Sequence, residues 1–266
     1  MTFDTTRNAT LTVKTRYPQQ TTDVTYQQGS NVIFHRTFDA FEYMYKNFDG
    51  NLLIQFCHRK GSEDGGKLVF IDMLSGQTRF SVNPEFGRQK NFKWHNNQLF
   101  VVFHYGEFAI NEEGKLADRS AFLRAWVKTG SIDIIPPLRE LFENIDQSYD
   151  ALLWYQCELD SYIYSHQRHL HALTKISEAL KLKGEICEYQ KDYYRAFRSY
   201  TLAIKLNPHL DIQKNLDRVA SHLHPDLIDS VNMALGLYAN AMIRMNKDVK
   251  NTAYKKYSVK LKVKLE

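Results

Sequence analysis

Histidine is the residue type whose spacing in this chain comes closest to a metal site. His166, His169 and His171 lie within six positions, and His222 and His224 form a second pair. On a helix, His166 and His169 would share a face, as two zinc ligands can. However, the chain has no His-Glu-x-x-His motif, and no carboxylate lies at a recognised ligand spacing. We therefore expect ordinary histidines, with no metal ion and no cofactor.

Motifs of other catalytic classes are absent from the sequence. There is no glycine-rich phosphate loop, no Gly-x-Gly-x-x-Gly fingerprint and no Gly-x-Ser-x-Gly nucleophile elbow. Cys57, Cys157 and Cys187 are far apart and odd in number, so we expect reduced thiols rather than a disulfide framework or a zinc knuckle. A catalytic triad that assembles only in space would leave no such trace, so an enzyme with a site between two halves of the chain remains an alternative.

Positive charge is concentrated near the C-terminus. The net charge is +5, but residues 244–266 carry 8 basic and 2 acidic side chains, whereas residues 138–243 carry 11 and 14. The lysines of this tail could contact phosphate or an acidic membrane surface. Residues 259–265 also alternate strictly between lysine and an apolar residue, which predicts a strand with one solvated face. We favour a strand at a sheet edge or an extended tail, and we do not expect nucleic acid as the partner.

Targeting segments are not evident in the sequence. The stretch from Met1 to Arg7 lacks the apolar run of a signal peptide. No apolar run approaches the ~18 residues needed to span a membrane. We therefore expect a cytoplasmic protein.

The first half of the chain has the pattern of an antiparallel β-sheet. Apolar or alternating runs are separated by turn-forming glycine, asparagine and serine, and the strands we expect are 9–15, 32–35, 52–56, 67–71, 78–82, 99–103 and 108–110. Residues 52–56 align with 99–103 at an offset of 47. This weakly resembles successive blades of a β-propeller, each a four-stranded meander. Two or three blades cannot close a ring, so we expect an open, blade-like sheet.

Two prolines, Pro136 and Pro137, mark the junction with a helical second half, because proline is excluded from helix interiors. We expect helices at 138–144, 152–164, 170–189 and 193–206, followed by helical apolar stripes within 210–223 and 227–245. The predicted fold is α+β. A β-rich, blade-like domain at 1–137 is expected to pack against a helical domain at 138–266, because an open sheet must cover one face.

The stretch 180–208 has the spacing of a helix–turn–helix repeat. The positions that carry this spacing are Leu180, Gly184, Ala196, Tyr200, Ala203 and Pro208, with Lys191-Asp192-Tyr193 as the turn. The stretch resembles one tetratricopeptide repeat, a 34-residue unit. Two positions depart from the family, because Lys183 stands in place of a leucine and Cys187 in place of a tyrosine. The resemblance implies a protein-binding role and neighbouring helices that bury the faces of the repeat.

The same resemblance implies a binding face. In that family, the inner surface of the first helix lines the ligand groove. Carried over by position, the groove residues are Glu178, Lys181, Glu185, Glu188 and Tyr189. The clamp for chaperone tails needs an asparagine where this chain has Glu185, so that subclass is not implied. Three carboxylates favour a basic partner; the alternative is that flanking helices cover this face and its charges only contact solvent.

Two classes of function therefore stand beside each other. We expect a non-enzymatic cytoplasmic protein that holds or inhibits one protein partner. An immunity protein that neutralises a toxin is the most specific form of this hypothesis, and a repeat-type adaptor or scaffold is its alternative. The other class is an enzyme whose site assembles between the two halves.

Overall fold

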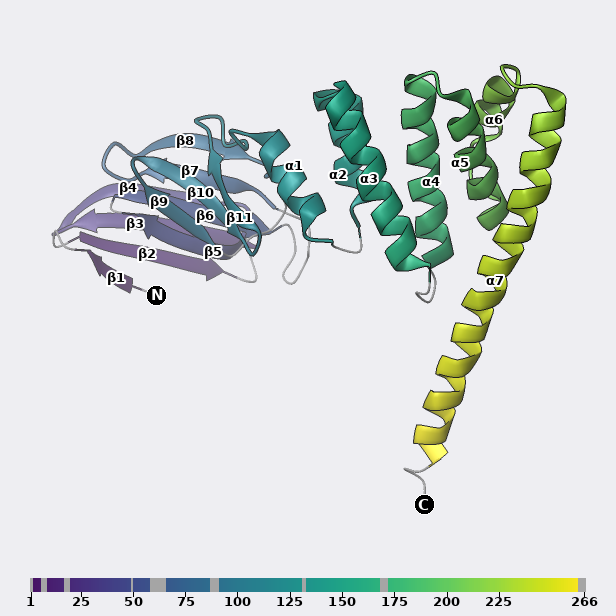
Figure 1. Ribbon diagram of the computed structural model, residues 1–266. Helices are drawn as coiled ribbons and strands as arrows, with labels where there is room; N and C mark the ends of the chain where they lie inside the picture. Colours follow the sequence, from purple (N-terminus) through teal and green to yellow (C-terminus); the bar gives the residue numbers. More distant parts are fainter. Residues whose placement is uncertain are drawn as a thin grey trace. The chain divides into compact units, whose positions relative to one another are not determined.

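The computed structural model describes residues 2–5, 9–16, 20–48, 50–57, 66–86, 91–130, 133–167 and 172–262. For residues 2–5 and 248–262 only the backbone is described. The chain divides into two compact units, Met1–Phe122 and Leu123–Glu266. The first is built from antiparallel strands and the second from helices (Figure 1), so the predicted α+β class is confirmed. The predicted packing of the sheet against the helices stays a prediction.

The described residues of the first unit form three antiparallel sheets, and in each the strands follow one another in chain order. Their strands are β1 (Thr2–Thr5), β2 (Ala9–Arg16), β3 (Thr21–Gln28) and β4 (Asn31–Phe38); β5 (Phe41–Phe48), β6 (Asn51–Cys57), β7 (Leu68–Asp72) and β8 (Gln77–Val82); and β9 (Phe92–His95), β10 (Gln98–Phe103) and β11 (Gly106–Ile110). The expected strands all fall on observed ones. β6 and β10, which contain the two aligned runs, are each the second strand of their meander.

Strand β6 lies between two apolar layers, and all seven of its residues are buried. On one face, Leu52 and Ile54 share a core with Leu11 of the first sheet. On the other side of the same sheet, Phe70 of β7 contacts Trp94 of β9, with ring centroids 5.4 Å apart. A strand covered on both faces needs apolar residues at consecutive positions. This is why 52–54 reads as an unbroken apolar run, whereas β2 alternates.

Helix α1 (Arg119–Lys128) was not predicted. Its first turn is capped by Asp118, whose carboxylate accepts a hydrogen bond from the Ala121 backbone N–H at 2.8 Å. Phe122 packs edge-on against Phe108 of β11, with centroids 5.2 Å apart. The division between the units falls inside α1, so residues 123–137, which we had assigned to the β-rich domain, belong to the helical unit.

The helical unit consists of successive hairpins that pack side by side (Figure 1). Its elements are α2 (Ile135–Glu140), the π-helical turn η1 (Leu141–Ile145), α3 (Tyr149–His166), α4 (Ala172–Tyr189), α5 (Tyr193–Leu206), α6 (Gln213–Ala220) and α7 (Pro225–Lys262). Along the chain the pairs are α2–η1 with α3, α4 with α5, and α6 with α7, but α6 and α7 both pack mainly on α5. Short connections at 146–148, 190–192 and 221–224 join the two helices of each pair.

The start of α2 corrects our prediction at the two prolines. The helix begins at Ile135, so Pro136 and Pro137 lie in its first turn rather than before it. Proline is compatible with that position, because the first N–H groups of a helix have no partner within the helix. The rule that excludes proline applies to the helix interior and does not extend to the first turn.

The α4–α5 hairpin closes tightly at Gly184. A Cβ atom at this position would lie 2.5 Å from Cε1 of Tyr200, so only glycine fits without a shift of that ring. Ala196 and Ala203 of α5 are fully buried. The turn between the helices uses Lys191 with a φ of 61°, and the Asp192 carboxylate accepts a hydrogen bond from the Arg195 N–H at 3.1 Å. Gly184 therefore lies where the sequence spacing required a close approach, and both alanines of the predicted contact are buried.

The C-terminal strand that we predicted at 259–265 is wrong over 259–262, where α7 continues as a helix to Lys262. Residues 263–266 lie outside the described residues. Extending an existing helix adds one hydrogen bond for each residue that is fixed, and no proline or glycine interrupts the chain after Gly236. Alternation of side chains predicts a strand only if another strand is available for pairing. Among the described residues, no helix is both long and apolar enough to cross a membrane.

Candidate protein-binding face of the helical unit

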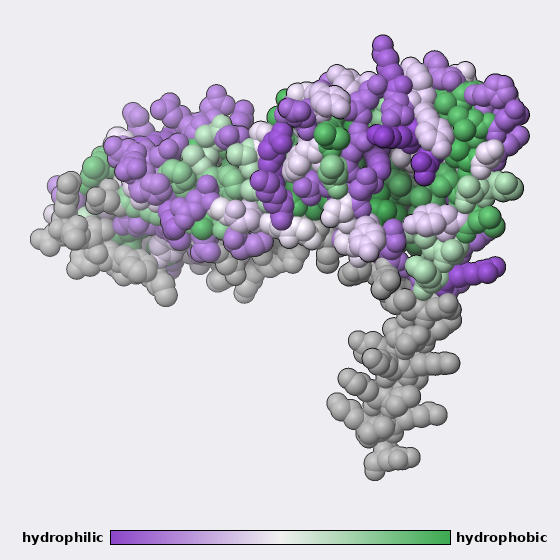
Figure 2. Space-filling view, in the orientation of Figure 1, coloured by the Kyte–Doolittle hydropathy of each residue, from purple (hydrophilic) through white to green (hydrophobic). Residues whose placement is uncertain are grey.

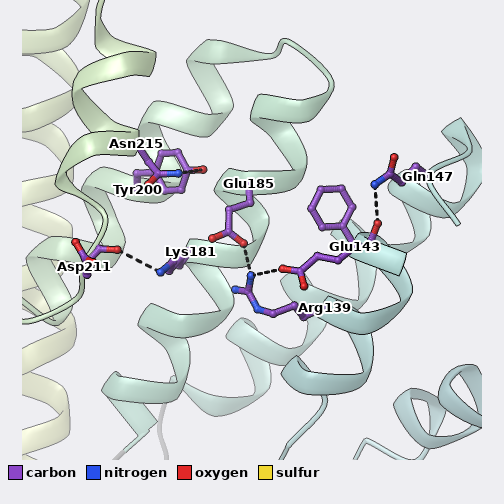
Figure 3. A network of polar contacts seen from close by, with 9 residues as sticks. Arg139, Glu143, Gln147, Lys181, Glu185, Tyr200, Asp211 and Asn215 are labelled. Atoms are coloured by element: carbon purple, nitrogen blue, oxygen red, sulfur yellow. Dashed lines mark hydrogen bonds and ion pairs between the residues drawn. The ribbon is translucent and has the colours of Figure 1, made fainter. Parts of the chain in front are cut away.

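The five residues predicted to line a groove all lie on α4, and other segments of the helical unit bind three of the four charged side chains. Glu185 is bound by Arg139 of α2, at 2.7 Å from its Oε2 atom (Figure 3). The same guanidinium lies 3.0 Å from Oε1 of Glu143 in η1. Burial lowers the pKa of Arg139, but the two carboxylates outweigh it and raise that pKa above its ordinary value. With a side chain 19% exposed, Glu185 therefore presents little unpaired negative charge.

Glu188 is bound in the same way by the helices that follow. Nε of Arg218 in α6 donates to its Oε1 atom, and the Tyr200 hydroxyl of α5 donates to its Oε2 atom at 2.9 Å. Nδ2 of Asn215 donates in turn to the Tyr200 oxygen at 3.4 Å (Figure 3). Burial raises the pKa of Glu188, but the hydrogen bonds from Arg218 and Tyr200 outweigh it, so the pKa lies below its ordinary value. The carboxylate is thus an integral part of the helical packing.

Lys181 and Glu178 also have partners within the unit. Nζ of Lys181 donates to the backbone oxygen of Asp211, just before α6, at 3.2 Å (Figure 3). Oε2 of Glu178 lies 3.2 Å from Nζ of Lys175, one turn earlier on α4. The four charged residues therefore belong to one polar row, which runs over the first helices of the hairpins, α2–η1, α4 and α6.

Tyr189 differs from the other four because much of it stays accessible. Its side chain is 52% exposed, and its ring meets Phe142 of η1 edge-on, with centroids 5.7 Å apart. A partly supported, accessible aromatic ring is the kind of group that anchors a protein interface. Of the predicted set, Tyr189 is the residue best placed to contact a partner.

Sequence reasoning identified the carboxylates but missed the arginines that bind them. Arg139 and Arg218 lie 46 and 30 residues along the chain from Glu185 and Glu188, respectively. No local spacing connects residues so far apart. The available signal was an arginine on α2 and another on α6, and it does not indicate which carboxylate each arginine binds.

The histidines and cysteines that were candidates for metal or thiol chemistry are not part of the polar row. The His166 ring stacks on Tyr162, with centroids 4.0 Å apart, while His169 and His171 lie outside the described residues. Within the described part of the chain, no group of three histidine, cysteine, aspartate or glutamate side chains could hold a metal ion. Cys187 is buried, and burial raises the pKa of its thiol to about 11. That thiol therefore stays protonated at neutral pH.

Comparison with known proteins adds no homologue. No family model, no curated protein and no solved structure matches this chain. The resemblance of residues 180–208 to a tetratricopeptide repeat therefore stays a prediction. Function is inferred from the faces of the helical unit alone.

Proposed function

We propose that this protein is a non-enzymatic protein that holds a protein partner on its helical unit. The observation that carries the proposal is the polar row, in which side chains of α2–η1, α4 and α6 link successive hairpins into one face. Stacked helical hairpins offer extended surfaces to other polypeptides. The repeat-like spacing of residues 180–208 supports the same role.

The positive charge of a partner contributes less to its recognition than the three carboxylates in the sequence suggest. A basic partner would have to compete with Arg139 and Arg218, which already bind Glu185 and Glu188. Polar contacts at an interface mainly set specificity and association rate, whereas aromatic anchors carry more of the binding energy. We therefore propose a partner anchored at Tyr189, with a basic surface as a secondary feature.

Site-specific photo-crosslinking in living cells tests this proposal. A photoreactive amino acid would replace Tyr189, and matched controls would carry it at Tyr149 on α3 and Val32 on β4, both exposed. We expect a polypeptide to be captured through position 189 and not through the controls. Equal capture at the three positions, or none at 189, would contradict the proposed face.

Tyr189→Ala provides a quantitative check once the partner is identified. We expect faster dissociation in surface plasmon resonance and a loss of about 1–2 kcal/mol of binding free energy or more, as for an interface hot spot. Tyr149→Ala serves as the matched control and should leave the rate unchanged. A neutralising protein would abolish the activity of one partner, whereas an adaptor would hold two partners at once, so stoichiometry and partner activity separate the two forms of the hypothesis.

A further inference from the structure

A groove lies on the side of α4 that faces away from the polar row. It has a volume of about 340 Å³ and is enclosed by α3, α4, α5 and α7. Leu180 and Lys183 of α4 line it, and at 3.6 residues per turn they point to the opposite side of that helix from Glu185. Nε2 of Gln167, the residue that follows α3, donates to the Tyr238 hydroxyl on α7 at 3.3 Å, which links the two helices beside the groove.

Part of the lining is apolar. Its apolar side chains come from all four helices and are Ile163, Leu180, Leu202 and Leu235. Figure 2 shows hydrophobic surface on this face of the helical unit, where α4, α5 and α7 lie in Figure 1, between hydrophilic side chains. An apolar side chain of a ligand could be removed from water here.

Cationic side chains dominate the charge of the lining. Among the described residues, the lining carries Lys183, Arg195 and Arg198 against a single carboxylate, Asp160. Lys183 is paired with that aspartate. Arg195 lies 3.4 Å from the capping carboxylate of Asp192, yet its side chain remains 65% exposed. Two guanidinium groups on one turn of α5 therefore stand beside an apolar surface.

Two tyrosines complete the groove. Tyr164 on α3 is 79% exposed, and Tyr238 on α7 is 45% exposed. Arg198 lies over the ring of a third tyrosine, Tyr194, at 5.5 Å from its centroid. Tyrosine and arginine are the residues most enriched where proteins bind proteins. The groove thus combines an apolar pocket, aromatic walls and an excess of arginine.

We propose that this groove binds an acidic segment of a partner protein, with one aromatic or aliphatic side chain in the pocket and flanking carboxylates on Arg195 and Arg198. The planar guanidinium group donates two parallel hydrogen bonds to a carboxylate, which makes arginine a selective partner for aspartate and glutamate. This inference rests on the proposed protein-binding function and specifies the chemistry of the partner on a second face.

Peptide binding to the full-length protein tests the inference directly. The probe is acetyl-Asp-Glu-Phe-Asp-Glu-amide, with two controls that replace its phenylalanine by alanine or its four acidic residues by lysine. Dissociation constants would be measured by NMR titration of the amide signals of the ¹⁵N-labelled protein. We expect shifts at Ser199 and Leu202, which lie in the groove, and binding weaker by about tenfold or more for each control.

Charge reversal on the protein locates the site. Arg195→Glu with Arg198→Glu should weaken binding of the acidic peptide by about tenfold or more. The matched control, Lys214→Glu with Lys247→Glu, makes the same change in net charge at exposed positions that do not line the groove. Tyr164→Ala, at a highly exposed position, should also weaken binding without a risk to folding.

Three results would overturn the inference. They are no binding of the acidic peptide at millimolar concentration, equal weakening by the two double variants, and tighter binding of single-stranded oligothymidylate than of the acidic peptide. The last result would assign the groove to nucleic acid, since arginine and tyrosine also bind phosphate and bases. Crosslinking through position 189 reports on the proposed function separately, so either proposal can fail while the other stands.

Discussion

The two sides of α4 carry charges that are used differently. On the polar row, Glu185 and Glu188 are each bound by an arginine from a neighbouring helix. In the groove, Arg195 and Arg198 remain exposed beside apolar side chains. Paired charges contribute to packing and leave little free charge to attract a partner, whereas exposed arginines next to an apolar pocket can bind an acidic one. The formal charge of the residues on a helix face therefore differs from the charge available to a partner, because residues of neighbouring helices can neutralise it.

The largest effect should come from Tyr200, which connects the core to the polar row. Its side chain is fully buried, and its hydroxyl donates to Glu188. Tyr200→Ala should lower the free energy of unfolding by about 3–5 kcal/mol because it leaves a cavity. Tyr200→Phe removes only the hydroxyl, with its hydrogen bonds to Glu188 and from Asn215, and should cost about 1.5–3 kcal/mol. Urea denaturation followed by circular dichroism measures both; equal costs would mean that the ring contributes nothing beyond its hydroxyl.

Ala196→Leu tests the close packing of α4 on α5, which supports both sides of α4. Ala196 is fully buried, so the larger side chain should overpack the contact and lower the free energy of unfolding by about 1–3 kcal/mol. Arg198→Leu, at an exposed position of the same helix, is the control and should have little effect. An unchanged melting temperature for Ala196→Leu would show that the two helices have room at this point.

The pH dependence of stability should reveal the contribution of the Glu188 carboxylate. Its folded pKa lies below the ordinary value of 4.5, so it stabilises the fold above that value. The contribution is lost as the pH falls through the lowered folded pKa. Glu188→Gln should therefore cost about 1 kcal/mol at neutral pH and progressively less in acid. Denaturation at several pH values, with Glu178→Gln as the control, measures this difference. If the free energies of unfolding of Glu188→Gln and wild type differed by the same amount at every pH, the ionised Glu188 carboxylate would not contribute to the network.

The smallest effect on stability is expected in the groove. Arg198 is exposed, so Arg198→Ala should change the free energy of unfolding by no more than about 0.5 kcal/mol. Arg139→Ala on α2 should cost more, because it leaves Glu185 and Glu143 without their shared cation. Thermal unfolding of the two variants compares the faces directly. If Arg198→Ala proved more destabilising than Arg139→Ala, the groove would contribute to the stability of the fold. The polar row would then be the surface whose charges are available to a partner.

Local patterns were enough to predict most of the secondary structure. Helix α5 spans the predicted residues 193–206, because its start is set by the capping aspartate Asp192 and its apolar residues follow the helical period. The consecutive apolar residues at 52–54 indicated a strand, and burial on both faces explains why they do not alternate. The errors at Pro136 and at 259–262 arose where one local rule competed with another and only the surrounding helix decided the outcome.

The amino-acid sequence by itself determined the class of fold, the hairpin built around Gly184 and the set of residues on the side of α4 that carries the polar row. These follow from side-chain period, turn chemistry and the absence of a Cβ atom, which act over a few residues. Tertiary structure alone decided that Arg139 and Arg218 bind Glu185 and Glu188, and that a cationic groove lies on the other side of the same helix. The physical reason is that electrostatic pairing and pocket formation depend on distances in space. Residues that are dozens of positions apart along the chain come close to one another only when the helices pack.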